Sequence, residues 1–218
     1  SYVNYTSTFK NGDNNGVMTV YGPNGMILTR GSYENGVRTG PWKWYYANGK
    51  ISEEATYVNG EMDGLNTEYH ANGKLKYTTT FSDGTQQGEF KIYHENGKVK
   101  LEGTSLDGNR HGKATSYTPD GSVMLIRMYN QGVIESYSYL GTDGKAVNFI
   151  PFTKEADTMM TYHKNGKPAL RCKRVNGMLE GPYISYYENG QMFENENFMY
   201  DENHGRSINY YMDGKVMA

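Results

Sequence analysis

The sequence has little apolar material with which to build an enclosed core. Only 36% of its 218 residues are hydrophobic, even with tyrosine counted, and the mean hydropathy is -0.80. Its 27 glycines and 21 tyrosines exceed what an ordinary globular domain carries. The net charge of -2 is too weak, and the aromatic content too high, for an intrinsically disordered chain. We therefore expect a folded protein with a thin core.

Other absences exclude classes of function. The sequence has no basic run and a pI near 6.2, so it lacks the concentrated Lys/Arg face that nucleic acid binding requires. No apolar run approaches the roughly 18 residues of a transmembrane helix, and no signal peptide is visible in the sequence as given. The single cysteine, Cys172, excludes an internal disulfide and favours a small buried apolar residue over a reactive thiol. We expect no nucleic acid partner and no membrane-spanning segment.

Glycines recur with a period of 24 residues, which indicates a repeat protein. The first column is Gly12, Gly36, Gly60, Gly84, Gly108 and Gly132. Nearly every member of the second column follows Asn or Asp: Gly25, Gly49, Gly73, Gly97, Gly121, Gly144, Gly166, Gly190 and Gly214. A tyrosine stands four residues before this glycine in eight copies: Tyr21, Tyr45, Tyr69, Tyr93, Tyr117, Tyr162, Tyr186 and Tyr210. Nine copies therefore fill the chain.

The segments that flank each Asn-Gly or Asp-Gly pair alternate with period two, as β-strands do. After Gly49, for example, Ala55 and Tyr57 belong to a more apolar face than Thr56. The dipeptides predict two-residue type I′ hairpin turns, in which both turn residues have positive φ. The sequence thus predicts an all-β fold, an elongated single-layer antiparallel β-meander of about nine stacked 24-residue β-hairpin repeats, twisted or curved.

One unit reads Tyr33-Glu34-Asn35-Gly36, then Gly40, Trp42, Tyr45, Asn48, Gly49 and Lys50. This pattern resembles the MORN repeat, and more closely the variant MORN repeat of bacterial antitoxin- or immunity-like proteins. The resemblance covers nearly the whole chain. It implies a sheet of stacked hairpins that acts as an interaction or targeting module, with protein and phospholipid partners in the wider family. It brings no catalytic residue and no cofactor.

The repeat is irregular in its sixth and seventh copies. Ser136 replaces a glycine, Leu140 replaces the tyrosine, Thr153 and Asp157 replace two glycines, and Pro151 cannot donate to a β-ladder. We expect copies one to six over residues 1–140, a bend or irregular segment over 141–160, and copies seven to nine over 161–218, all within one continuous repeat domain.

The polar residues give no catalytic or metal-binding pattern. The five histidines fall into two columns: His70, His94 and His163 follow the repeat tyrosine, and His111 and His204 precede the middle glycine of their copies. Equivalent residues in adjacent copies would lie two strands, roughly 9–10 Å, apart, which is too far for two imidazoles to share a zinc ion. The acidic segment 201–205 suggests calcium ligands but lacks the spacing of an EF-hand loop. We expect a protein that is not an enzyme and that binds no cofactor or metal.

Two features are candidates for binding. Some copies carry aromatic residues at positions that are not aromatic in other copies; these aromatics are Trp42, Trp44, Tyr46, Phe90 and Tyr183. This irregular occurrence indicates either a partner-binding patch or local packing, and we favour packing. Lysines such as Lys50, Lys74 and Lys98 follow the hairpin turns, whereas acidic residues predominate in the turns between copies. This asymmetry either steers a partner or keeps the turns soluble, and solubility is favoured.

The sequence therefore predicts a non-catalytic repeat protein that binds a macromolecule, most readily another protein, with an antitoxin- or immunity-like role implied by the resemblance. The alternative is a surface or envelope module that binds glycan or lipid headgroups through exposed aromatics. The unpaired end strands could join two copies of the chain into a homo-oligomer. The resemblance implies a bacterial protein, for which we favour an exported, periplasmic or cell-surface location over the cytoplasm.

Overall fold

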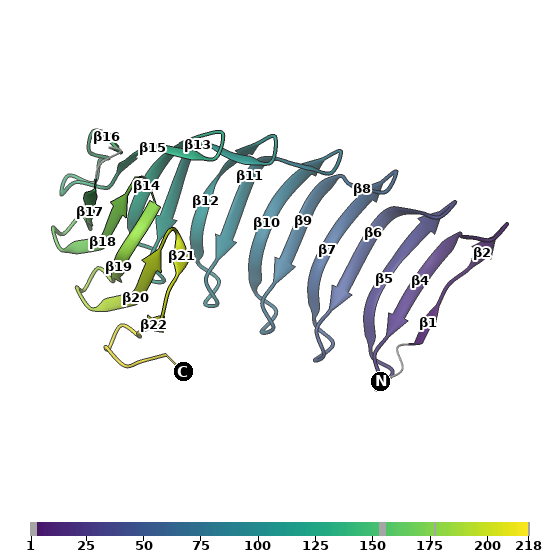
Figure 1. Cartoon of the computed structure of the whole chain (residues 1–218). Helices are drawn as coiled ribbons and strands as arrows, with labels where there is room; N and C mark the ends of the chain where they lie inside the picture. The colour runs from purple at the N-terminus through teal and green to yellow at the C-terminus, as the bar shows by residue number, and fades with distance from the viewer. Residues whose placement is uncertain (1–3, 153–155, 177, 218) are drawn as a thin grey trace. The chain divides into compact units, whose positions relative to one another are not determined.

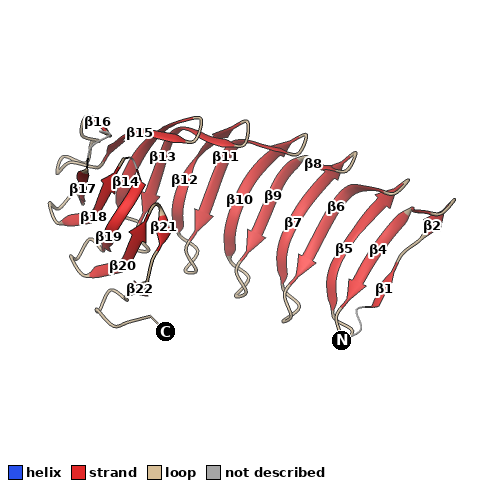
Figure 2. Ribbon diagram, in the orientation of Figure 1, coloured by secondary structure: helices blue, strands red, loops and turns tan. Residues whose placement is uncertain are grey.

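The structure is a computed structural model that describes residues 4–152, 156–176 and 178–217. Within these ranges every regular element is a β-strand, and no helix occurs (Figure 2). These residues consequently include no helix long and apolar enough to cross a membrane.

The strands follow one another closely along the chain. In order they are β1 (Asn4–Thr6), β2 (Phe9–Lys10), β3 (Asp13–Asn14), β4 (Gly16–Tyr21), β5 (Ile27–Glu34), β6 (Val37–Tyr45), β7 (Ile51–Val58), β8 (Glu61–Met62), β9 (Gly64–Tyr69), β10 (Leu75–Ser82), β11 (Thr85–Tyr93), β12 (Val99–Leu106), β13 (Asn109–Tyr117), β14 (Val123–Asn130), β15 (Val133–Ser138), β16 (Ile150–Pro151), β17 (Asp157–Tyr162), β18 (Pro168–Val175), β19 (Met178–Tyr186), β20 (Met192–Met199), β21 (Glu202–Asn203) and β22 (Ile208–Asn209).

These strands form two antiparallel meanders. The first sheet has the order β1-β4-β5-β6-β7-β9-β10-β11-β12-β13-β14-β15-β16, with β8 paired to β7, and it does not close on itself. The second sheet has the order β17-β18-β19-β20-β21, with β22 paired to β20, and β2 and β3 form a small hairpin. The predicted all-β antiparallel meander is confirmed.

The type I′ turns lie between the copies, not inside them. Asn35 and Gly36 both have positive φ, at 49° and 77°, as a type I′ turn requires. In the hairpin after β6, Gly49 has a φ of 79°, but Asn48 is not among the residues with positive φ. The prediction of type I′ hairpins at the Asn-Gly pairs of the second column is therefore wrong.

The hairpin turns inside the copies are three-residue loops. Tyr46 N donates to Lys50 O at 2.8 Å, and Gly49 N donates to Tyr46 O at 2.9 Å, so residues 47–49 form the loop. The Asn48 side chain accepts a hydrogen bond from Lys50 N at 3.0 Å, which stabilises a turn with negative φ at Asn48. This geometry is a type I turn followed by one left-handed residue, and glycine is the residue that adopts that conformation at least cost.

The contacts of the chain define two compact units. Unit 1 contains residues 1–97 and 104–109, and unit 2 contains residues 98–103 and 110–218. The predicted irregular segment, 141–160, contains the change from the first sheet to the second: β16 ends at Pro151 and β17 begins at Asp157. Residues 153–155 of that segment, with the predicted Thr153 irregularity, lie outside the described residues, and the predicted domain boundaries stay a prediction.

In unit 1, strands β4 to β11 lie side by side in one layer, with the two kinds of turn at opposite ends of the strands (Figure 1). Alternate residues point to opposite faces, as in any strand. On one face, which we call the Trp42 face, Trp42, Ala55 and Tyr57 are buried. The opposite face, which we call the Arg30 face, carries exposed Thr56 and Arg30. The predicted apolar face is confirmed.

Unit 2 contains a two-layer core that the sequence did not lead us to expect. Buried residues from the first sheet meet buried residues from the second in one cluster, made of Met124, Leu125, Tyr137, Met159, Ala169, Leu170 and Cys172. The Thr161 hydroxyl donates to Met124 O at 2.7 Å and joins β17 to β14. Each large apolar side chain buried here contributes about 1.5–3 kcal/mol, so unit 2 is stabilised by enclosed side chains as well as by pairing of strands.

Candidate binding surface

The rim lysines hold successive hairpin turns together. Lys50 Nζ donates to the Asn72 carbonyl at 2.7 Å, and Lys74 Nζ donates to the Asn96 carbonyl at 3.1 Å. In unit 2, Lys98 Nζ donates to Asp120 O at 2.5 Å. Each lysine thus bridges its own turn to the turn one repeat later. The predicted roles of Lys50, Lys74 and Lys98 in steering a partner or in solubility stay predictions, and the structure adds a third role, the fixing of turn spacing.

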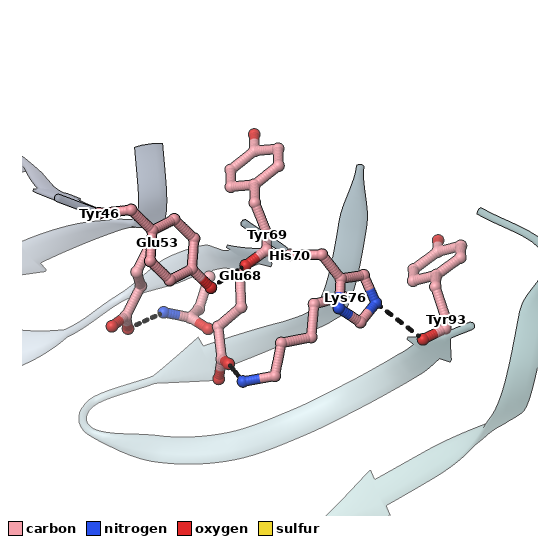
Figure 3. Close-up of polar contacts among 8 residues, drawn as sticks. Tyr46, Glu53, Glu68, Tyr69, His70, Lys76 and Tyr93 are labelled. Carbon is pink, nitrogen blue, oxygen red and sulfur yellow. Dashed lines mark hydrogen bonds and ion pairs between the residues drawn. The ribbon is translucent and has the colours of Figure 1, made fainter. Parts of the chain in front are cut away.

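A second set of side chains makes the same kind of bridge. Tyr46 OH donates to the Tyr69 carbonyl at 2.5 Å, and His70 Nε2 lies 3.2 Å from the Tyr93 carbonyl, to which a protonated Nε2 donates (Figure 3). Unit 2 repeats this with His163 to Tyr186 O at 2.8 Å. The residue after the repeat tyrosine therefore links copies two, three and seven to the copy that follows, and for Tyr46 this explains why a polar aromatic stands there.

Trp42 is packed inside the Trp42 face. It is 2% exposed and lies over Gly31, where a Cβ atom would come within 2.1 Å of the indole ring. Tyr33 meets the ring edge-on at 5.2 Å between centroids, and the Arg38 guanidinium lies 4.6 Å from the ring centroid. Arg38 also donates to Tyr57 OH at 3.3 Å. The tyrosine hydroxyls raise the pKa of Arg38, Tyr33 most, so the cation over the indole stays charged.

The other predicted aromatics are also partly or fully covered. Trp44 is half-buried beside Trp42, with 5.9 Å between ring centroids. Phe90 is 3% exposed. Tyr183 packs against the core cluster of unit 2, and burial raises the pKa of its hydroxyl. The structure does not gather these five aromatics into one exposed patch; their burial favours packing, and a role in partner binding stays a prediction.

Two carboxylates face each other near the aromatic cluster. Glu53 and Glu68 are direct cross-strand partners on the Trp42 face. Glu53 accepts a hydrogen bond from Asn66 Nδ2 at 2.7 Å, and Glu68 is 2.7 Å from Lys76 Nζ (Figure 3). Each carboxylate therefore has its own donor within the sheet, and the pair is not arranged as a free acid and base.

The Arg30 face carries a groove between β4, β5 and β6. It has a volume of about 390 Å³ and is lined by Val17, Arg30, Gly31, Ser32, Pro41, Lys43 and Tyr45. Arg30 is exposed and is the direct cross-strand partner of Lys43. Val17 is 47% exposed, and Pro41 is also exposed. The groove thus combines two cations with apolar walls.

The charges on this face differ in how well they are compensated. Lys43 Nζ lies 2.6 Å from Glu54, which also accepts a hydrogen bond from Tyr69 OH at 2.9 Å. The hydrogen bond to Glu54 raises the pKa of Lys43, and the same bond lowers the pKa of Glu54 against the effect of burial. In the described part of the chain, the Arg30 side chain forms no hydrogen bond or ion pair.

The repeat of the structure corresponds to a known family. The family model described as MORN repeat variant matches residues 14–35, 38–59, 62–83, 86–107 and 179–200. These five segments of 22 residues each cover 110 of the 218 residues. The chain belongs to the MORN repeat variant family. A comparison with curated proteins finds no match.

MORN repeats are generally non-catalytic binding modules. Across residues 4–152, 156–176 and 178–217, no three His, Cys, Asp or Glu side chains are grouped as a metal site would need. Cys172 is buried in the core of unit 2, and burial raises the pKa of its thiol to about 11, so at neutral pH it is not a thiolate nucleophile.

Sequence reasoning missed the most distinctive surface of this MORN repeat protein. Arg30 and Lys43 are 13 residues apart, and nothing in their spacing marks them as partners. They meet because β5 and β6 are joined by a type I′ turn with one irregularity in register between Arg30 and Ser32. The available signal was the repeat itself, since the residues 24 positions after these two are Glu54 and Thr67.

Proposed function

We propose that this MORN repeat protein is a non-catalytic module that binds another protein through the Arg30 face of unit 1. One observation carries the proposal: exposed apolar side chains from successive copies follow one end of the strands on this face, at Val17, Pro41, Val58 and Leu65. Beside them runs a row of charged and threonine residues. Protein interfaces combine apolar contacts with a polar surround in this way.

The Trp42 face supports glycan or lipid binding less well. Stacking on a sugar requires aromatic rings with an open face, whereas Trp42 and Phe90 are almost fully buried. Trp44 and Tyr46 are half-buried, and the Tyr46 hydroxyl is already bonded to Tyr69 O. A surface module that binds glycan or lipid headgroups is therefore the second candidate. A toxin or effector as the protein partner rests on the resemblance to antitoxin-like repeats.

The test is affinity capture by the full chain from a native lysate of its source, followed by cross-linking and mass spectrometry. Leu65→Glu places a charge in the exposed apolar band, and Val133→Glu is its matched control in unit 2, since the two side chains are 60% and 66% exposed. We expect one protein to be enriched by the wild-type chain and by Val133→Glu, but not by Leu65→Glu. Equal capture by both variants, or binding to a glycan array without any protein partner, contradicts the proposal.

A further inference from the structure

One position on the Arg30 face departs from the repeat. A single cross-strand row runs Thr19, Arg30, Lys43, Glu54, Thr67, Thr78 and Lys91. The residues equivalent to Arg30 in the next two copies are Glu54 and Thr78. Only at Arg30 and Lys43 do two cations of this row stand directly opposite each other, an arrangement that destabilises a sheet. Because the fold does not require it, this pair calls for a functional explanation.

Of the two positive charges in the groove, one is not compensated by a carboxylate of the described residues. Glu54 neutralises Lys43 at 2.6 Å, while the Arg30 side chain forms no ion pair with any described residue. One carboxylate would balance the charge of Arg30, and a guanidinium donates two parallel hydrogen bonds to the two oxygens of a carboxylate. A phosphate group carries close to two negative charges at neutral pH. Its second charge would lie beside Glu54, so the charge count favours a carboxylate.

The walls of the groove favour a protein segment over a small acid. Val17 and Pro41 present apolar surface next to the cations, one step along the strands toward the turns between copies. Two hydroxyls also line the groove, those of Ser32 and Tyr45, and neither is bonded to another described side chain. Hydroxyls could donate to carboxylate oxygens beside the guanidinium. A free acid would leave the apolar walls without contacts, whereas an acidic residue between apolar neighbours would cover them.

We propose that this groove binds an extended acidic segment of the partner protein, in which an Asp or Glu pairs with Arg30 and apolar neighbours contact Val17 and Pro41. The proposal rests on the protein-binding function proposed above and names the part of the surface and the chemistry that recognise the partner. Because the charge pair occurs at one place in the unit 1 row, the segment has one register on the repeat array.

The test titrates the full, isotope-labelled chain with a short acetylated and amidated peptide that has one aspartate between two leucines. We expect chemical-shift changes at the backbone amides of Val17, Arg30, Ser32 and Lys43. A peptide with asparagine in place of aspartate should bind about tenfold more weakly or not at all, because a charge-assisted pair is lost. Equal binding of the two peptides, or shifts confined to other residues, overturns the proposal.

Variants of the chain separate the groove from general electrostatics. Arg30→Glu should abolish peptide binding, and Arg30→Gln should weaken it. Arg171→Glu makes the same charge change at an exposed arginine of β18 and should leave binding unchanged. Comparable loss in Arg171→Glu overturns the proposal. So does binding of inorganic phosphate, or of vesicles containing phosphatidylserine, at the groove in preference to the peptide.

Partner capture distinguishes failure of this inference from failure of the proposed function. If the wild-type chain and Arg30→Glu capture the same protein equally well, the groove is not its binding site, although the protein-binding function stands. If the wild-type chain captures no protein, the proposed function itself fails. Circular dichroism spectra of Arg30→Glu should match those of the wild type, and its melting temperature should not be lower, since the side chain is exposed and the change replaces a like-charge pair with an opposite-charge pair.

Discussion

Gly31→Ala is expected to destabilise unit 1 by about 2–3 kcal/mol, although it adds a single methyl group. The new Cβ atom would lie 2.1–2.6 Å from three atoms of the Trp42 ring, whereas ordinary contact starts at 3.4 Å. The indole would have to move by about 1 Å. Tyr33, Arg38 and Tyr57 surround it at ring distances of 5.2, 4.6 and 6.0 Å, so a shift that relieves the clash weakens these contacts.

A double substitution, Gly31→Ala with Trp42→Ala, tests whether this clash is the cause. Trp42→Ala alone removes a buried indole and should cost about 3–5 kcal/mol. In the double variant the methyl group added at position 31 has no ring to meet and fills part of the cavity. The cost of the double substitution should therefore be less than the sum of the two single costs, with a coupling of at least about 1 kcal/mol, as expected for residues in direct contact.

Urea unfolding followed by far-ultraviolet circular dichroism measures these differences, since it does not depend on the tryptophan that is removed. Gly22→Ala is the matched control: Gly22 has no positive φ, and its Cβ would meet Asn24 and Leu28 at the ordinary distances of 3.4 and 3.5 Å. It should shift stability by no more than about 0.5 kcal/mol. A Gly31→Ala variant as stable as Gly22→Ala, or strictly additive costs in the double variant, would refute the reasoning.

Three further outcomes are expected. Lys74→Met removes the bond to Asn96 O and should cost about 0.5–1 kcal/mol in thermal unfolding, whereas Lys164→Met, at an exposed lysine with no such bond, should be neutral; equal effects would contradict the bridging role. Cys172, with its pKa raised to about 11, should react with a thiol reagent at pH 8 only after unfolding, and rapid reaction of the native chain would show that it is accessible. Burial, reinforced by Glu196, raises the pKa of Glu194, so the folded state binds this proton more tightly than the unfolded state. Stability should therefore fall as pH rises through the raised pKa, and Glu194→Gln should be more stable than the wild type at pH 7 but not at pH 4, a crossover that melting curves at both pH values would reveal.

The strand order was predictable because the turn residues recur in phase along the chain. The turn types were not, because an Asn-Gly pair suits both a two-residue type I′ turn and the end of a three-residue loop. In the type I′ turn, Asn35 itself adopts positive φ; in the loop, Asn48 uses its side chain to accept from Lys50 N and leaves positive φ to Gly49. That choice depends on how many residues lie between the paired strand ends.

The packing and hydrogen bonds around the candidate binding surface were harder to predict, because they depend on residues and backbone groups that form no recognisable sequence motif. Trp42 fits only because Gly31 replaces the larger side chains found at the equivalent positions, Ala55 and Thr79. The rim lysines bond to backbone carbonyls, which leave no mark in a sequence. For unit 2 a signal did exist: Met124, Leu125 and Ile126 are consecutive apolar residues, and such a run predicts a strand covered on both faces.

Hydrogen bonds between the turns of successive copies explain how one copy of the repeat can carry surface residues that its neighbours lack. Spacing between copies is held by bonds from side chains to backbone carbonyls, such as Lys50 to Asn72 O and Tyr46 to Tyr69 O. Carbonyl acceptors are present whatever residue occupies the position, so residues on the strand faces can change without loss of register. A charge pair such as Arg30 and Lys43 then costs only its own repulsion, and it marks one copy among otherwise similar neighbours. Recognition on this fold should therefore depend on departures from the repeat consensus, and substitution of consensus residues should change stability more than binding.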